Sequence, residues 1–370
     1  MRVLVYPADQ QGCGYHRLIW PGEALIRQGH DVTVIPQEDR RVRVGLSHTG
    51  EVKSVDLPPD VDVVVFQRVT HQWLSGVIRF IRERGIATVV DIDDDLTSIH
   101  PSNPAFTGLH PSTSGKRDGF GKPLLHGWQH LHDACAEATL VTVSSPALLR
   151  IYAPHGRGAV LRNVLAPHYF GIPHDDSDVI AWPAMLHAHP NDPDVVGPAV
   201  SRLVNEGAEF RIVGRPEGCG RAFMLPDDPP GGGASNIFDW PTAVAKIGIG
   251  ITPLADTRFN RAKSWLKPLE LAAVGVPWVG SPRTEYAALH KLGCGVLAER
   301  PKDWYRVLRD LRRDPTRRAE LSHAGREVAE TLRLDDHAWR WLEAWDEAYR
   351  IQTGRRSSVV ASVDRLAAPS

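Results

Sequence analysis

Short apolar runs alternate with helical patterns along most of the chain, and this alternation constrains the fold more than any other feature. The run RVLVYP at 2–7 is followed by a glycine-containing loop, a helical pattern and a second apolar run, HDVTVIP. A third run lies at 61–67, and those at 86–93 and 139–145 each follow a further helical pattern. Strands that alternate with helices form parallel βαβ units. The sequence therefore predicts an α/β fold built on parallel sheets.

The alternating pattern stops once and then restarts. The polar segment at 166–178 is rich in turn-forming residues, and a new strand–helix–strand pattern follows it. Because 370 residues correspond to roughly two domains, we expect an N-terminal Rossmann-like domain at 1–165 and a second one at 166–334. A tryptophan-rich amphipathic helix is predicted at 335–353. The tail at 354–370 has little apolar periodicity, so we expect it to be disordered.

Composition and charge argue against several classes of function. No apolar run reaches the roughly 18 residues that a membrane-spanning helix needs. The net charge of −1 gives no overall attraction to nucleic acid, although one local basic groove would suffice to bind it. The 4 cysteines are scattered and form no Cys-x-x-Cys pair, which argues against a zinc cage and a disulfide framework. We therefore expect a cytoplasmic protein with reduced thiols.

The stretch FNRAKSWLKPLELAAVGVP at 259–277 carries the clearest chemical signal. Lys263 and Lys267 gather just ahead of Glu270, where a helix begins. Positive charge at that end opposes the helix dipole, so the arrangement makes sense if an anion lies between the two ammonium groups. The N–H groups of the first turn would bind a phosphate, and the carboxylate suits two neighbouring ribose hydroxyls. The stretch predicts a nucleoside-diphosphate site; the alternative is a solvated basic loop with a surface glutamate.

In its spacing this stretch resembles the nucleotide-sugar site of GT-B glycosyltransferases, in particular the retaining enzymes of glycosyltransferase family 4. The resemblance implies that Glu270 binds the ribose of the donor. It also implies that Lys263 and Lys267, with Ser264 beside them, contact the diphosphate and assist its departure. The family pattern is matched by Lys263, Ser264, Lys267, Glu270, Ala273, Gly275, Pro277 and Val279.

One position departs from the family pattern. Many members carry a second glutamate eight residues before the first, where it contacts the donor sugar. Ala262 stands at that position here. We therefore expect Asn260 or Arg261 to contribute to recognition of the donor sugar instead.

Further segments match the family in the correct order along the chain. VLRNVL resembles the linker region, VIAWPAMLHAHPNDPDVV the start of the second domain, and FRIVGRPEG a strand end that approaches the nucleotide. The resemblance implies two Rossmann-like domains that face each other across a cleft, the GT-B fold, with the helix at 335–353 crossing back to the N-terminal domain. The matching residues are Asn163, His189, Asp192, Gly214 and Arg215, of which Gly214 and Arg215 are candidates for nucleotide binding.

A glycine-containing loop, ADQQGCGYHR, follows the first predicted strand. Gly12 and Gly14 form a lone Gly-x-Gly, which is a weak signal because the dinucleotide-binding pattern needs a third glycine and a later acidic residue. In the enzymes that the chain resembles, the equivalent loop approaches the donor diphosphate or the acceptor. Arg17 would then reach a phosphate; the alternative is an arginine on the surface of the first helix.

An acidic run, DIDDD at 91–95, ends another predicted strand. Its carboxylates would be costly to bury unless they are solvated or bound to a partner. A hard metal ion is one alternative, but GT-B enzymes usually work without a bound metal, so we expect none. We favour an acceptor-side or structural role, in which Asp93, Asp94 and Asp95 bind acceptor hydroxyls or cap the next segment.

Two histidines follow predicted strands of the first domain. His71 comes after VVFQR, and His100 lies in a long loop at 98–124 that is rich in Pro, Gly and Ser. Ligands bind at the carboxyl ends of parallel strands, so both positions fall on the expected cleft. We expect His71 on the acceptor side and His100 as a catalytic candidate; the alternative is that both are incidental.

Together these features favour a glycosyltransferase that moves a hexosyl or pentosyl group from a nucleotide-diphosphate sugar to an acceptor, with retention and without a metal. A UDP- or GDP-sugar is the expected co-substrate, and no bound cofactor is expected. The oligomeric state stays open, with a homodimer as one expectation.

The set GCGYHR, DIDDDL and KSWLKPLE resembles glycosyltransferases from phages of actinobacteria. That resemblance implies a virion protein, a modified DNA base or a glycan as acceptor, in the host cytoplasm. Two alternatives remain. One is a sugar-nucleotide epimerase that uses the acidic run, and the other is a degenerate GT-B protein that only binds a nucleotide, which the alanine at position 262 supports.

Overall fold

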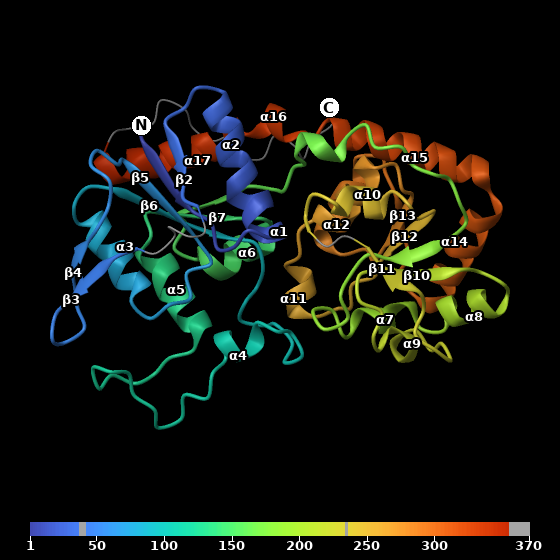
Figure 1. The fold of residues 1–370 in the computed structure, drawn as a ribbon, viewed down its shortest axis with the longest axis horizontal. Helices are drawn as coiled ribbons and strands as arrows, with labels where there is room; N and C mark the ends of the chain where they lie inside the picture. The colour runs from blue at the N-terminus through green and yellow to red at the C-terminus, as the bar shows by residue number, and fades with distance from the viewer. Residues whose placement is uncertain (37–41, 234–235, 355–370) are drawn as a thin grey trace. The chain divides into compact units, whose positions relative to one another are not determined.

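The computed structural model describes residues 1–36, 42–233 and 236–354. These residues form two compact units (Figure 1). The second unit comprises Ser98–Pro104 and Val164–Arg333. The first comprises Met1–Thr97, Ala105–Asn163 and the segment that begins at Leu334. The tail predicted at 354–370 lies outside the described residues, apart from Gly354.

The first unit is built on a six-stranded parallel sheet with the strand order β2-β1-β5-β6-β7-β8. A separate antiparallel hairpin joins β3 to β4. The sequence pattern did not indicate this hairpin, because both of its strands are short and partly exposed. The strands are β1 (Val3–Tyr6), β2 (Val32–Val34), β3 (Val44–Leu46), β4 (Val52–Val55), β5 (Val63–Gln67), β6 (Ala87–Ile92), β7 (Leu140–Val143) and β8 (Gly158–Val160).

The last helix of the chain belongs to the first unit. It packs against β5, β6 and β7, and Figure 1 shows it in red along that sheet. The return of the C-terminal helix predicted from the family resemblance is thereby confirmed. The helices of this unit are α1 (Gly12–Gly14), the π-helix η1 (Tyr15–Ile19), α2 (Trp20–Arg27), α3 (Leu74–Arg82), α4 (Phe106–Leu109), α5 (Gly127–Glu137), α6 (Pro146–Tyr152), α16 (Leu334–His337) and α17 (Trp339–Thr353).

The second unit repeats the plan, with a six-stranded parallel sheet in the order β11-β10-β9-β12-β13-β14. Its strands are β9 (Ile180–Trp182), β10 (Phe210–Val213), β11 (Gly231–Gly232), β12 (Ile249–Thr252), β13 (Trp278–Gly280) and β14 (Val296–Leu297). Its helices are the 3-10 helix η2 (Pro167–Tyr169), α7 (Asp192–Val196), α8 (Ala199–Asn205), α9 (Cys219–Ala222), α10 (Trp240–Val244), α11 (Arg258–Arg261), α12 (Leu266–Ala273), α13 (Thr284–Lys291), α14 (Pro301–Arg313) and α15 (Pro315–Glu330).

The strands at the centre of both sheets are buried along their whole length. All residues of β5 and β6 in the first unit, and of β9 and β12 in the second, are buried. Parallel sheets covered by helices on both faces require such continuous apolar strands. The two parallel-sheet α/β domains predicted from the sequence are confirmed. Of the helices formed by the described residues, none combines the length and the apolar character that crossing a bilayer requires.

Each sheet reverses its strand order beside the first strand of its unit. In the first unit the chain leaves β1 toward β2 and later returns to β5 on the other side of β1. In the second unit it leaves β9 toward β10 and returns to β12 on the other side. At such switch points the connections depart in opposite directions and leave the carboxyl ends of the two strands accessible. Ligands of open parallel α/β sheets bind at such places.

Arg17 in η1 is buried, with 1% of its side chain exposed. Its Nε and Nη2 donate to the two carboxylate oxygens of Asp91 at 3.1 and 2.8 Å. Its Nη1 donates to the backbone oxygen of Leu161 and to Oδ1 of Asn163. Trp341 of α17 lies 5.6 Å from the guanidinium and donates its Nε1 to the backbone oxygen of Arg17 at 2.7 Å.

The burial of Arg17 corrects both sequence expectations for this residue. It neither lies on the surface of the first helix nor offers its guanidinium to a phosphate, because its described hydrogen bonds all go to the protein itself. Its partner Asp91 lies 74 positions away in the sequence, so no local pattern could reveal the pair. The arginine instead joins the first helical segment to β6.

Replacement of Arg17 by methionine is expected to lower the free energy of unfolding by about 3–5 kcal/mol, because it leaves the buried carboxylate of Asp91 without its cation. Arg27→Met is the matched control. Arg27 also pairs with an aspartate, Asp335 at 3.0 Å, but its side chain is 57% exposed, so we expect a loss below about 1 kcal/mol. Urea denaturation of both variants measures the difference, and equal losses would contradict the role assigned to burial.

Candidate functional site

One buried carboxylate joins the two loops that leave the switch point of the second unit. Asp192 begins α7, after β9, and is 2% exposed. Its Oδ1 accepts hydrogen bonds from the backbone N–H of Ala255 at 2.9 Å and from Nδ2 of Asn260 at 2.6 Å. Its Oδ2 lies 2.8 Å from Nδ1 of His189. The carboxylate therefore fixes the loop after β9 against the loop after β12.

The amide of Asn260 has a single favourable orientation. Its Nδ2 donates to the Asp192 carboxylate and, at 3.0 Å, to the backbone oxygen of Ala255. Both partners are acceptors, so a rotated amide would lose both hydrogen bonds. Its Oδ1 is buried and has no hydrogen-bond partner within the described part of the chain. Since an unpaired buried oxygen costs about 1–3 kcal/mol, a ligand hydroxyl that reached it after a small local movement would be favoured.

The start of α12 brings together the basic and acidic residues that the sequence analysis singled out. Lys267 lies in the first turn, and Glu270 lies one turn on and is 4% exposed. The hydroxyl of Tyr169 donates to Oε1 of Glu270 at 2.7 Å, and Nζ of Lys267 lies 3.5 Å from Oε2. Nζ of Lys267 also lies 4.3 Å from the centroid of the Trp240 ring. The carboxylate is thus oriented from two sides.

Tyr169 is a site residue that sequence reasoning missed. It ends the 3-10 helix η2, in a segment whose polar composition predicted only a linker. Burial, and then the carboxylate of Glu270, raise the pKa of its hydroxyl well above the ordinary value, so the hydroxyl stays protonated and donates. The two residues are 101 positions apart, and no local pattern links them.

Lys263 and Ser264 lie in the loop between α11 and α12, and both are half-buried. Nζ of Lys263 is 4.4 Å from the centroid of the Phe259 ring. Oγ of Ser264 accepts a hydrogen bond from the backbone N–H of Leu266 at 3.4 Å. Lys263 and Ser264 therefore directly precede α12, and Lys267 lies in its first turn.

Gly214 follows β10, the strand beside β9, and has a φ of 140°. Its backbone N–H and oxygen pair with Gly232 at 2.8 and 3.1 Å. A Cβ at Gly214 would lie 3.2 Å from the backbone oxygen of Ala184, so a side chain there would crowd the loop that follows β9. Arg215 comes next and is exposed. Both candidates therefore lie at the same edge of the sheet as Asp192.

The glycine loop after β1 has an explanation within the protein. A Cβ on Gly14 would lie 1.8 Å from the backbone oxygen of Asp9, so glycine is required there by sterics. Oδ1 of Asp9 accepts hydrogen bonds from the N–H groups of Gln11 and Gly14, both at 2.9 Å. Gly12 begins α1. The close approach that requires Gly14 is thus to the chain itself, in place of the diphosphate approach expected from the sequence.

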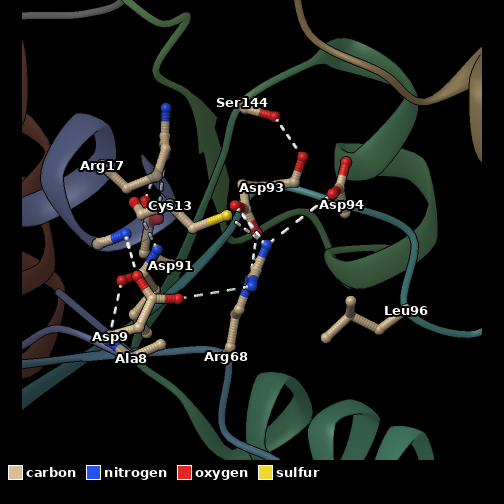
Figure 2. Close-up of polar contacts among 12 residues, drawn as sticks. Ala8, Asp9, Cys13, Arg17, Arg68, Asp91, Asp93, Asp94, Leu96 and Ser144 are labelled. Carbon is tan, nitrogen blue, oxygen red and sulfur yellow. Dashed lines mark hydrogen bonds and ion pairs between the residues drawn. The ribbon is translucent and has the colours of Figure 1, made fainter. Parts of the chain in front are cut away.

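Arg68 lies at the centre of a polar cluster at the carboxyl ends of β5 and β6 (Figure 2). Its guanidinium donates to both oxygens of Asp93 at 2.5 and 2.6 Å and lies 2.9 Å from Sγ of Cys13. Asp9 and Asp94 lie 3.9 and 3.8 Å from it. Burial raises the pKa of Asp93, but Arg68, followed by Cys13 and Arg17, lowers it by more, so the net shift is downward and the carboxylate keeps its charge. Sequence reasoning did not identify Arg68.

The acidic run is largely paired inside the protein, which corrects the acceptor-side prediction for Asp93 and Asp95. Asp91 and Asp93 each pair with an arginine. Asp95 is fully buried and accepts hydrogen bonds from the N–H and the hydroxyl of Thr97, which is the capping role weighed as the alternative. Asp94 keeps 21% of its side chain exposed. Across the described residues, no three His, Cys, Asp or Glu side chains are arranged to hold a metal ion.

The two candidate histidines fall in different units. His71 lies in the first unit, shortly after β5, as predicted. His100 is exposed and belongs to the second unit through the segment Ser98–Pro104. Its Nδ1 lies 2.8 Å from Oγ of Ser102, whose hydroxyl donates to the backbone oxygen of His187 at 3.0 Å. Its predicted place at the strand ends of the first domain is therefore corrected.

Two parallel-sheet α/β units, with a C-terminal helix that packs on the first, define the architecture of GT-B glycosyltransferases. No family model matches the sequence, and no curated protein matches it either. Solved structures do resemble the fold, at identities that establish the fold alone.

Three of these structures illustrate the likeness. Sucrose-phosphate synthase from Thermosynechococcus elongatus has a TM-score of 0.58 and 14% identity, over 94% of this chain and 99% of that one. A glycosyltransferase from Rickettsia africae has a TM-score of 0.60 and 12% identity, over 94% and 97% of the two chains. HepE from Anabaena, in complex with UDP, has a TM-score of 0.58 and 14% identity, over 94% and 100%.

Removal of the Tyr169 hydroxyl in Tyr169→Phe is expected to cost about 1.5–3 kcal/mol of unfolding free energy, the range for hydrogen bonds to charged groups. Tyr305→Phe is the matched control. The Tyr305 hydroxyl donates to Glu206 at 2.8 Å, but that pair is exposed, so we expect a loss below about 1 kcal/mol. Guanidinium denaturation compares the two variants. A neutral Tyr169→Phe would show that this hydroxyl does not support Glu270.

Proposed function

We propose that the protein is a glycosyltransferase that moves a sugar from a nucleoside-diphosphate sugar to an acceptor, with its donor site in the second unit. The observation that carries the proposal is the start of α12, where two lysines flank the helix terminus and a buried glutamate is oriented by Tyr169. The sequence resemblance to family 4 at the same residues supports it. So does the similarity in fold to glycosyltransferases, one of them solved with UDP.

The start of α12 supplies what a diphosphate needs. Backbone N–H groups of a first helical turn have no partner within the helix and can bind an anion. In α12, Pro268 has no N–H and the N–H of Leu266 donates to Oγ of Ser264, so the backbone N–H assigned to the diphosphate is that of Lys267. Lys263 and Lys267 add charge-assisted hydrogen bonds. The contact from Lys267 to Glu270 is long, at 3.5 Å, so the ammonium group is able to turn toward a phosphate oxygen. Ser264 and Arg215 add a hydroxyl and a guanidinium at the same edge of the sheet.

Glu270 is assigned to the ribose of the donor. A carboxylate only accepts hydrogen bonds, and its two oxygens together offer about four lone-pair positions. Tyr169 uses one of them at 2.7 Å, and Lys267 approaches another. Two neighbouring ribose hydroxyls would donate hydrogen bonds to the same carboxylate. Because the carboxylate is already oriented, binding does not have to order it, which reduces the entropic cost.

Transfer breaks the bond between the anomeric carbon and the diphosphate oxygen and forms a bond from that carbon to the acceptor oxygen. The electron pair of the broken bond stays with the diphosphate, and the proton of the acceptor hydroxyl passes to water. The ammonium groups of Lys263 and Lys267, with the backbone N–H of Lys267, stabilise the charge that develops on the leaving group. From the family resemblance we further infer retention, a metal-independent reaction and a UDP- or GDP-sugar as donor.

We assign the domain at 166–334 to binding of the donor and the domain at 1–165 to binding of the acceptor. The acceptors considered are a virion protein, a modified DNA base and a glycan. The epimerase alternative depends on the carboxylates of the acidic run. Most of these are paired within the protein, which argues against that alternative. The nucleotide-binding alternative predicts a different outcome in one respect: a degenerate protein would bind the nucleotide sugar without breaking the bond between the sugar and the diphosphate.

A panel of UDP, GDP, ADP and dTDP is expected to contain one nucleotide that stabilises the protein, by about 2.7 kcal/mol at 100 times its Kd. Glu270→Gln should weaken that binding about tenfold or more, since an amide donates where the ribose needs an acceptor. Glu320→Gln is the matched control, because Glu320 is exposed and pairs only with Arg317 among the salt bridges described. Thermal denaturation gives the readout. No shift with any nucleotide would overturn the proposed function.

Asn260→Ala is expected to leave the affinity for the free nucleotide within about twofold and to lower turnover of the nucleotide sugar about tenfold, because Asn260 is assigned to the sugar and not to the nucleotide. Release of the nucleoside diphosphate from UDP-glucose provides the assay if UDP is the nucleotide that binds. Asn205→Ala, at the exposed end of α8, is the control. An equal loss of nucleotide affinity and of turnover would contradict the assignment.

A further inference from the structure

A pocket of about 520 Å³ lies in the first unit at the carboxyl ends of β1 and β5, the switch point of that sheet. Tyr6 and Phe66 line it; they are direct partners on neighbouring strands, and their rings stack with centroids 5.3 Å apart and 14° between the planes. Val44 and Leu46 of β3 and Trp73, just ahead of α3, line it as well. This volume is large enough for a ring system.

The residues that line the pocket are mostly apolar, and two of its polar side chains are already bonded within the protein. Of its fourteen residues ten are apolar or aromatic, and none is acidic. Gln67 uses both ends of its amide, accepting from the N–H of Ala8 at 2.9 Å and donating to the backbone oxygen of Cys13 at 3.1 Å. The guanidinium of Arg68 is paired with Asp93. The four polar lining residues are Gln67, Arg68, Thr70 and His71.

This lining argues against two kinds of ligand. A diphosphate needs several cations or N–H donors, but Arg68 is already neutralised by Asp93 and lies 3.8 Å from Asp94. A sugar carries hydroxyls around the whole edge of its ring, and burying them without partners is unfavourable. A flat apolar ring avoids both penalties and gains contact with aromatic side chains.

We propose that this pocket binds a flat apolar ring of the acceptor, an aromatic or heteroaromatic group with one or two polar atoms at its edge. The ring packs against Tyr6, Phe66 and Trp73, and a polar atom at its edge meets the Tyr6 hydroxyl. Naming this ligand as the acceptor rests on the proposed function, whereas the preference for a flat ring rests on the lining alone.

Tyr6 can act as a hydrogen-bond donor in this pocket. Its hydroxyl is protonated at neutral pH, as in any tyrosine, and burial, followed by the charge of Asp56, raises its pKa further. The pocket therefore presents a neutral donor beside apolar walls. A polar atom at the edge of a ring finds one partner there, while the face of the ring contacts apolar side chains.

Binding of 4-methylumbelliferone, a flat hydroxylated ring system, to the full chain without any nucleotide tests the proposal. Ligand-observed NMR is expected to show saturable binding. Leu46→Trp adds bulk to the pocket from β3, and Trp73→Ala removes an aromatic contact; each should weaken binding about tenfold. Trp339→Ala is the matched control, because Trp339 is 47% exposed on α17 and does not line the pocket, and it should bind like the unaltered protein.

Methyl glucoside serves as the polar ring in the same assay. The proposal is overturned if methyl glucoside binds as tightly as 4-methylumbelliferone. It is also overturned if neither pocket variant changes binding while circular dichroism shows both to be folded. Weaker ring binding in either folded variant, with Trp339→Ala unaffected, supports the pocket.

Nucleotide titration of the same samples separates this inference from the proposed function. A protein that binds a nucleoside diphosphate but no flat ring overturns the pocket and leaves the glycosyltransferase proposal intact. A protein that binds the ring at this pocket but no nucleotide supports the pocket and overturns the proposed function. Transfer of sugar to 4-methylumbelliferone, lost in Leu46→Trp, supports both.

Discussion

A buried carboxylate needs partners, and in each unit this requirement fixes the loops at the carboxyl edge of the sheet. Asp192 is bonded to His189, to Asn260 and to the backbone of Ala255. Asp93 is bonded to Arg68, which also contacts the glycine loop after β1 through Cys13. Asp192 connects segments that leave β9 and β12 in opposite directions. In the first unit Arg68 connects the segments that follow β5 and β1, and Asp93 holds Arg68 from the segment that follows β6.

The candidate donor site is built on the loop that Asp192 fixes. That loop leads through α11 to the start of α12, where Lys263 and Lys267 lie ahead of Glu270. Tyr169 reaches the same carboxylate from a separate segment. The carboxylate oxygens of Glu270 are positioned by these contacts before any ligand binds. The candidate site is therefore preorganised, which lowers the entropic cost of binding.

The sequence predicted the features that depend on neighbours within a turn or a strand. The βαβ alternation predicted both sheets, and the spacing around Lys267 and Glu270 predicted a helix start that the structure confirms. It could not predict contacts between residues that are far apart in the sequence. The acidic run looked like a site for acceptor or metal because its arginine partners come from elsewhere in the chain: from Arg17, 74 positions before Asp91, and Arg68, 25 before Asp93. The pocket beside Tyr6 draws on several separate segments, so no single stretch could reveal it.

The chain order of the two units has a consequence for biosynthesis. The second unit occupies Val164–Arg333, whereas the first also needs the segment that begins at Leu334. A ribosome therefore delivers every strand of the first sheet early, but Trp341, which covers Arg17, emerges only after the whole second unit has been made. Domains usually fold as they are synthesised. Here the unit that begins first is completed last, and until then the face of its sheet that α17 covers remains exposed to the solvent and to chaperones.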